Sequence, residues 1–304
     1  MDTVQRRKFP QLLRRQGRRR GRDSRDQLCA PVVQSTVPGG RRDTLRVIQI
    51  LSKIRVWRTT TMRTTAIINL KGGVAKTTTA LNMAAILAKD YKQRVLLVDA
   101  DSQCNCTEFF QRDAVHPGTL ADMLRGLAPC IEHSRFDGVD LLPGDDSLMD
   151  LDLTKIETGS ASAVCLRELT AELGDRYDRM IIDCPPAFNA ASAAALVAAD
   201  EVIIPIKLDA FSLRGMANIM QQVSNMRKIN DSLTVAGILP TMWYKSDNII
   251  EAEKMLREFG LPVLPHVRRT NKVDDMTFAQ EPLVISSPKS AAGVDYRRVV
   301  AALM

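Results

Sequence analysis

Two lysines five residues apart flank a pair of glycines in the stretch NLKGGVAKTTTA, residues 69–80. A glycine turn between a strand and a helix that opens with Lys-Thr-Thr gathers backbone N–H groups and a helix N-terminus around one point, which suits phosphate oxygens. The phosphate-loop formula G-x-x-x-x-G-K-[ST] is not met literally, because Leu70 and Ala75 stand where it asks for glycine. Taken alone, the stretch also fits a glycine turn before an ordinary helix.

Acidic residues at the ends of two other apolar runs favour phosphate chemistry. The run RVLLVDAD contains Asp99 and Asp101, and RMIIDCPP contains Asp183. Carboxylates at strand ends can hold Mg²⁺, directly or through its waters, and can orient an attacking water. Each of them alone could cap a helix or a turn. Together with the loop they are the parts of a Mg²⁺-dependent nucleotide triphosphatase.

These residues lie in apolar runs that alternate with helical patterns from residue 62 onward. Strands that are apolar almost throughout are typical of sheets covered by helices on both faces, so the pattern predicts an α/β fold with a doubly wound, mostly parallel sheet. In such sheets ligands bind at the carboxyl ends of the strands. Strands are expected at 64–70, 94–101, 139–145, 178–186, 201–206 and 234–241, and helices at 77–90, 119–127, 161–173, 190–199, 213–229, 248–259 and 291–303.

The positive charge of the chain is confined to its first fifth. Residues 1–61 hold 16 Lys and Arg against 4 Asp and Glu, whereas residues 62–304 hold 26 against 31. Residues 1–61 are too charged and too poor in apolar residues to fold alone, so we expect a basic, disordered extension before a nucleotide triphosphatase domain at 62–304. The extension is either an arm that binds DNA or acidic lipid, or an artefact of annotation, with translation beginning at Met62.

Cysteine usage and hydropathy point to a reducing cytosol. The six cysteines form no CxxC pair, and the CxC of Cys104 and Cys106 is not accompanied by clustered histidines, so we expect free thiols and not a metal centre. No apolar run approaches the roughly 18 residues of a membrane-spanning helix. The expected location is cytoplasmic, without a membrane partner.

Several ordered motifs together resemble one family. KGGVAKTTTALNMAAILA, RVLLVDADSQCNCT, DRMIIDCPPAFNAASAAALVAADEVIIPI, FSLRGMANI and PVLPHVRR follow one another at matching intervals across residues 62–304. They are similar to the ParA/MinD group of P-loop ATPases with a deviant Walker A motif, and within it to ParA/Soj-type chromosome and plasmid partition ATPases. The resemblance implies ATP and Mg²⁺ as cofactors and slow, partner-stimulated hydrolysis.

The resemblance assigns different roles to the two lysines. Lys76 corresponds to the lysine that contacts the phosphates bound in its own subunit, and Lys71 to the signature lysine that reaches the partner's ATP across a homodimer. Asp101 would position the hydrolytic water. Two facing ATP molecules bring negative charge into the interface, and Lys71 would neutralise part of it.

The remaining nucleotide contacts are implied by the same matching. Thr77 would bind Mg²⁺ and Thr78 a phosphate, while Asp99 and Asp183 would support the metal through its waters. Ser102 and Cys104 replace a proline and a glycine of the family pattern, which loosens that loop. The adenine end retains Pro265 but lacks the asparagine that contacts the base. The backbone amides expected to cradle the phosphates belong to Gly72, Gly73, Val74 and Ala75.

Partition ATPases of this kind bind DNA nonspecifically as ATP dimers and are released by a ParB-like DNA-binding partner, so the resemblance implies a nucleoid-associated protein. The alternative is a related ATPase that positions protein cargo or regulates without binding DNA. Salt-sensitive phosphate contacts would come from basic side chains late in the chain. The candidates are Arg214, Arg227, Lys228, Lys245, Arg268, Arg269 and Lys272.

Overall fold

The computed structural model describes residues 28–29, 62–110, 118–157, 159, 161–258 and 260–304. The predicted extension at 1–61 lies outside the described residues except for Leu28–Cys29, which form the two-residue strand β1. The predicted boundary at Met62 therefore stays a prediction. Met62 itself is buried at the start of the folded body.

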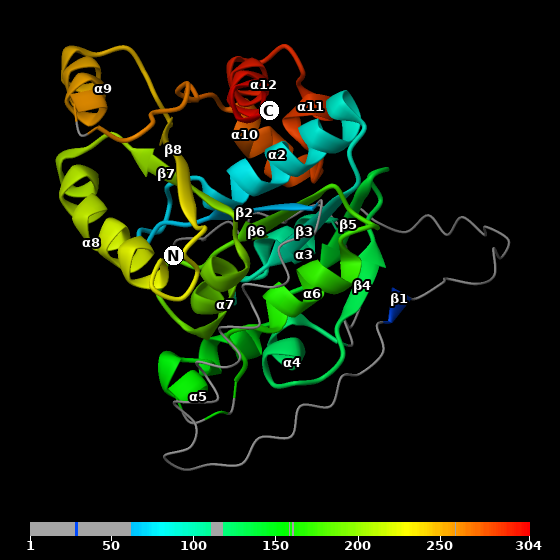
Figure 1. Cartoon of the computed structure of the whole chain (residues 1–304). Coiled ribbons are helices and arrows are strands. Elements are labelled where there is room, and N and C mark those ends of the chain that lie inside the picture. Colours follow the sequence, from blue (N-terminus) through cyan, green and yellow to red (C-terminus); the bar gives the residue numbers. More distant parts are fainter. Residues whose placement is uncertain (1–27, 30–61, 111–117, 158, 160, 259) are drawn as a thin grey trace, which may run out of the picture.

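One sheet of eight strands, in the order β1-β4-β5-β3-β6-β2-β7-β8, forms the centre of the molecule (Figure 1). All neighbouring pairs from β5 to β8 are parallel, whereas β4 pairs antiparallel with β5 and with β1. The predicted doubly wound, mostly parallel sheet is confirmed. The strands from β2 on are Arg63–Ile67 (β2), Val95–Asp99 (β3), Cys130–His133 (β4), Val139–Leu142 (β5), Arg179–Asp183 (β6), Glu201–Lys207 (β7) and Thr234–Thr241 (β8).

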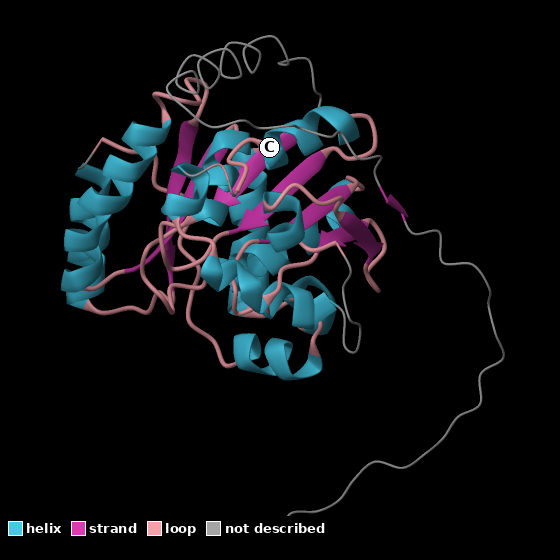
Figure 2. Cartoon of the chain, turned by 90° about the horizontal axis from the view of Figure 1, so that it is seen from below, coloured by secondary structure: helices cyan, strands magenta, loops and turns pink. Residues whose placement is uncertain are grey.

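Helices cover both faces of the sheet (Figure 1), and Figure 2 shows the strands from below with helices packed around them. Figure 1 places α2, α10, α11 and α12 on one side and α4 to α7 on the other. The helices are Lys76–Tyr91 (α2), Asn105–Phe110 (α3), Leu120–Leu124 (α4), Leu153–Glu157 (α5), Cys165–Leu173 (α6), Ala190–Ala198 (α7), Ala210–Met226 (α8), Asp247–Glu258 (α9), Lys272–Ala279 (α10), Leu283–Ser286 (α11) and Ala291–Leu303 (α12), with a 3₁₀ turn at Asp146–Asp150.

Successive side chains of a strand point to opposite faces of the sheet, so each strand contributes to two hydrophobic clusters, one on each face. On β2 and the residue that follows it, Ala66 and Ile68 pack with α4, α6 and α7, while Ile67 packs with α2 and α12. On β6, Ile182 and Ile181 divide in the same way. Both faces are apolar, which explains the nearly continuous hydrophobic runs of the sequence.

Candidate nucleotide-binding site

Three functional segments meet at the carboxyl edge of the sheet. Asp99, the last residue of β3, is the register partner of Asp183, the last residue of β6. Asp183 in turn pairs with Ile67, the last residue of β2, after which the glycine loop begins. The parallel sheet therefore places the loop beside both carboxylates, as the sequence predicted.

The loop enters α2 through left-handed backbone conformations. Gly73 has φ 67° and Ala75 has φ 65°, and α2 begins at Lys76. Within the described chain, no side chain caps this helix start, and its first turn holds no acidic residue. The first N–H groups of α2 are therefore left to an anionic ligand, as at phosphate-binding helix termini.

Two polar side chains outside the glycine run fix the loop. Asn69 accepts the N–H of Lys71 at 3.0 Å and donates to the carbonyl of Pro205 at 2.7 Å. Thr241, at the end of β8, donates to the carbonyl of Val74 at 3.1 Å. Neither residue is identified from the sequence, because their roles depend on contacts with β7 and β8.

The two lysines occupy different surroundings. Lys76 is buried, and burial lowers its pKa against the opposing effect of the Asp183 and Asp101 charges. Its Nζ donates to the carbonyl oxygen of Lys71 at 3.0 Å. The side chain of Lys71 instead lies with its Nζ 3.8 Å from Asp209 Oδ1, just before α8. Lys76 is thus the lysine that lies among the carboxylates.

Asp99 is satisfied by the chain itself. Its Oδ2 accepts the N–H and the hydroxyl of Thr107, both at 2.8 Å, and its Oδ1 accepts the N–H of Asp101 at 3.3 Å. Burial raises its pKa to about 6. These bonds hold the loop that carries Asp101, whose Oδ1 accepts the N–H of Gln103 at 3.1 Å.

Asp183 has unused hydrogen-bonding capacity. It is fully buried, and its Oδ1 has no hydrogen-bond partner among the described residues. Burial and the charge of Asp99 raise its pKa to about 7, although a hydrogen bond from Thr77 and the charge of Lys76 oppose the rise. A buried carboxyl oxygen without a donor, in a site rich in negative charge, fits a hydrated cation nearby.

These observations fit Mg²⁺ held jointly by protein and nucleotide. In the described part of the chain, no group of three or more His, Cys, Asp and Glu side chains is arranged to hold a metal alone. Thr77 would be the direct ligand and Asp183 would act through water, so the phosphates would supply further ligands. The same role was predicted for Asp99, but both of its oxygens already accept hydrogen bonds from Thr107 and Asp101. When bound, the ion would neutralise charge on the phosphates.

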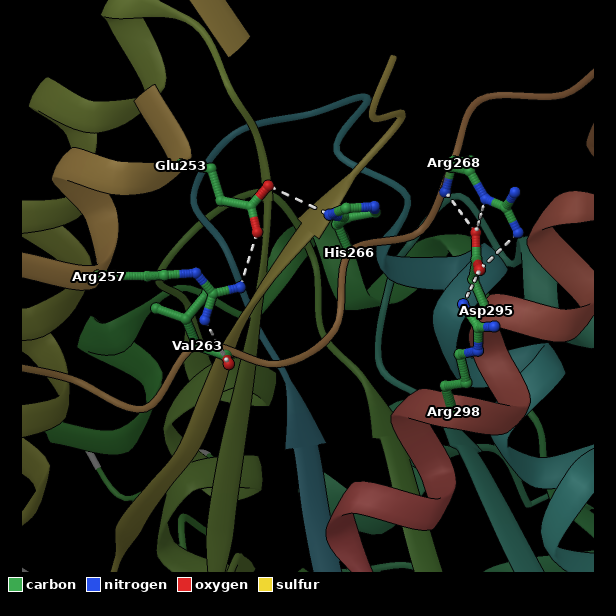
Figure 3. Close-up of polar contacts among 7 residues, drawn as sticks. All are labelled: Glu253, Arg257, Val263, His266, Arg268, Asp295 and Arg298. Atoms are coloured by element: carbon green, nitrogen blue, oxygen red, sulfur yellow. Dashed lines mark hydrogen bonds and ion pairs between the residues drawn. The ribbon is translucent and has the colours of Figure 1, made fainter. Parts of the chain in front are cut away.

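Near the predicted adenine end, Pro265 is followed by His266, whose ring stacks on Trp243 with centroids 4.0 Å apart and planes 1° apart. Glu253 on α9 accepts from both His266 and Arg257 (Figure 3). Trp243 follows β8 and its indole Nε1 has no hydrogen-bond partner among the described residues. Aromatic surface thus stands near the carboxyl end of β8, beside the phosphate loop.

The predicted DNA-binding residues do not form one group. Lys245, Arg268, Arg269 and Lys272 lie beyond the carboxyl end of β8, where Arg269 N–H bonds to the carbonyl of Trp243. Arg227 and Lys228 follow α8 and precede the amino end of β8, at the opposite edge of the sheet. Nothing is described of the Arg214 side chain.

Two of these cations are held by carboxylates. Asp295 accepts from Arg268 Nε at 2.7 Å and from its Nη2 at 2.8 Å, and it lies 3.6 Å from Arg298 (Figure 3). Lys272 pairs with Asp275 at 2.7 Å. Arg269, Lys245 and Lys228 are exposed and form no ion pair with another described residue. Arg269, Lys245 and Lys228 are therefore better placed than Arg268 to contact the phosphates of DNA.

Comparison with known proteins identifies the family. A family model described as an AAA domain matches residues 62–235. The chain is 32% identical over 247 residues to the chromosome partitioning protein ParA of Caulobacter vibrioides, covering 78% of this chain and 92% of that protein. The chain belongs to the ParA/MinD superfamily of P-loop ATPases. The predicted family is thus confirmed.

Solved structures support the fold of this ParA/MinD member. An ATP complex of McdA from Cyanothece superposes with a TM-score of 0.71 at 24% identity, covering 80% of this chain and 97% of that one. A cobyrinic acid a,c-diamide synthase from Mycobacterium smegmatis, with bound ADP and magnesium, has a TM-score of 0.67 at 28% identity, covering 80% and 94%. ATP and Mg²⁺, the predicted cofactors, agree with the ligands of these relatives.

Among the described helices of this ParA/MinD member, none combines the length and apolar character needed to cross a membrane.

Proposed function

We propose that this ParA/MinD member is a partition ATPase of a plasmid, chromosome or mobile element. It binds ATP with Mg²⁺, forms an ATP-sandwich homodimer that holds DNA nonspecifically on the nucleoid, and releases it after hydrolysis stimulated by a ParB-like partner. The observation that carries the proposal is the separation of the two lysines. Lys76 lies among the carboxylates of its own subunit, whereas Lys71 extends toward α8.

This separation supports two successive binding events. Lys76 and the first amides of α2 would contact the phosphates of the same subunit, and Asp101, on the adjacent loop, would orient water. Lys71 is more exposed, with 34% of its side chain accessible, and would meet the phosphates of a facing subunit. Nucleotide binding and dimerisation are then one linked equilibrium.

An ATPase that positions protein cargo without DNA is the second candidate. This candidate is favoured because Arg268 and Lys272, two of the residues predicted to bind DNA, are already paired with carboxylates of the same chain. The two candidates share the nucleotide mechanism and differ only in what the dimer holds. DNA retention by the ATP dimer therefore separates them.

The test uses three variants of the full chain with ATP and Mg²⁺. Lys76→Ala should lose nucleotide binding; Lys71→Ala should bind ATP but stay monomeric and release DNA; Asp101→Ala should dimerise without turnover. The matched control is Lys254→Ala, which removes an exposed lysine from α9. Sedimentation gives the oligomeric state, and DNA retention across a salt series gives the phosphate contacts.

A Lys71→Ala protein that dimerises on ATP as wild type does would overturn the sandwich mechanism. A wild-type dimer that holds no DNA at low salt would favour the cargo ATPase instead.

A further inference from the structure

The side chain of Lys71 is packed against α8. A Cβ added at Gly215 would lie 3.3 Å from Lys71 Cε, so the lysine stem runs across this helix where it has no side chain. The Nζ then lies 3.8 Å from Asp209 Oδ1. Asp209 stands between the end of β7 and the start of α8, at the same carboxyl edge as the glycine loop.

The backbone of Lys71 is held as well. Its N–H is accepted by Asn69, and its carbonyl accepts a hydrogen bond from Nζ of Lys76. Lys76 is the side chain best placed to bind phosphate, so one lysine of the loop holds the other. A phosphate oxygen is a stronger acceptor for an ammonium group than a neutral carbonyl is. ATP binding would therefore draw Lys76 away from Lys71.

We propose that Asp209 is a positioning residue that holds Lys71 on α8 until the phosphates of a facing subunit displace it. The inference rests on the proposed sandwich dimer. Once Lys76 has turned to the phosphates, Lys71 keeps the Asn69 bond and the contact with Asp209. That ion pair is partly exposed and weak, so the phosphates of a facing subunit displace it. Binding within one subunit then precedes the contact across the dimer.

Asp209 also precedes the N-terminus of α8, where an acidic residue stabilises a helix. This ordinary role predicts only a loss of stability on substitution. The positioning role predicts a gain in dimerisation, because Asp209→Asn removes the ion pair that competes with the phosphates of the facing subunit for Lys71. The helix-stabilising role is therefore tested by the free energy of unfolding, and the positioning role by the dimerisation constant.

The experiment compares wild type with Asp209→Asn, Asp209→Glu and the matched control Glu251→Gln, which removes one exposed carboxylate from α9. Monomer–dimer constants are measured by sedimentation equilibrium with Mg²⁺ and a non-hydrolysable ATP analogue. We expect dimerisation of Asp209→Asn to be about two- to five-fold tighter at low salt, with the difference lost at high salt. Asp209→Glu and Glu251→Gln should match wild type.

A second comparison tests whether the effect passes through Lys71. In a Lys71→Ala background, Asp209→Asn should change neither ATP affinity nor the residual dimerisation. If wild type dimerises and Asp209→Asn dimerises equally or more weakly, the positioning role is wrong while the sandwich stands. If wild type does not dimerise with the analogue, the proposed function fails and the positioning role fails with it.

Discussion

Ala75 and Cys104 occupy positions where related loops carry glycine, and both keep a left-handed backbone. Their φ angles are 65° and 53°. A side chain with a Cβ is strained there, at a cost of about 1–2 kcal/mol per residue. From the sequence, Cys104 in place of glycine predicts a looser loop. The structure instead holds Cys104, like Ala75, in the left-handed conformation that glycine adopts most easily.

Replacing either residue with glycine should therefore stabilise the protein. We expect Ala75→Gly and Cys104→Gly each to raise the free energy of unfolding by roughly 0.5–1 kcal/mol, since relief of strain exceeds the entropy lost by glycine. The free energy of unfolding is measured by urea denaturation in the absence of nucleotide. The control Ala171→Gly, within α6, should destabilise by about 1 kcal/mol. Equal destabilisation at all three positions would contradict the role of the φ angle.

The buried carboxyl of Asp183 makes stability depend on pH. Its pKa is about 7 in the folded protein and near the ordinary 3.8 when unfolded. Between these values the folded state binds more protons, so the stability of the nucleotide-free protein falls as pH rises from about 4 to 7. Asp99, with a pKa raised to about 6, acts in the same direction.

The neutral variant Asp183→Asn should lose less stability than wild type as the pH rises from about 4 to 7. We expect it to be more stable than wild type at pH 8 by roughly 1–3 kcal/mol, and equal to it near pH 4. Unfolding curves at three pH values without Mg²⁺ test the prediction. An identical pH profile for the two proteins would show that Asp183 does not carry the burial penalty.

At the scale of elements, β8 separates the DNA-binding candidates. In a dimer whose subunits meet across their nucleotides, the carboxyl edges of the two sheets face each other. Basic residues beyond the carboxyl end of β8 in both subunits would then form one continuous surface. Basic residues near the amino end of β8 would lie far apart in the dimer. We expect the pair Lys245→Ala with Arg269→Ala to weaken DNA retention and to lower the salt slope by about 3–4 per dimer. The pair Arg227→Ala with Lys228→Ala, the matched control, should change both less. The reverse order would place DNA at the amino edge.

Elements with strong apolar patterns were predicted closely, and others were missed. The expected strand at 234–241 and helix at 291–303 coincide with β8 and α12. Strand β4 was missed because its four residues, CIEH, carry no long apolar run and depend on pairing with β5. The short helices α3 and α11 depend likewise on packing against α2, and α10 depends on packing against α11.

In the candidate site, too, residues within local sequence motifs could be predicted, whereas residues defined by tertiary contacts could not. The glycine loop and the carboxylates could be predicted, because contiguous motifs place them at strand ends. Asp209, Asn69 and Thr241 could not, because their contacts join segments up to 167 residues apart, as between Thr241 and Val74. Nor could sequence separate Arg268, held by Asp295, from the exposed Arg269 beside it.

At the scale of the whole molecule, a protein that begins at Met62 should fold and bind ATP. Met62 is buried, Arg63 N–H bonds to the carbonyl of Asp178, and the family match begins at residue 62. Without the first 61 residues, β4 no longer pairs with β1, which it meets at two register positions. We expect a cooperative thermal transition and ATP affinity within about two-fold of the full chain. Insolubility or loss of ATP binding in the shorter protein alone would show that residues 1–61 are structural.

The ring stack at the end of β8 has a spectroscopic consequence. The sequence contains two tryptophans, Trp57 and Trp243, so in a protein that begins at Met62 all tryptophan fluorescence comes from Trp243. That indole lies parallel to His266 at 4.0 Å, two residues beyond the threonine that bonds to the glycine loop. Its fluorescence is therefore an intrinsic, label-free optical signal at the nucleotide edge, against which the arrival and departure of ATP can be timed.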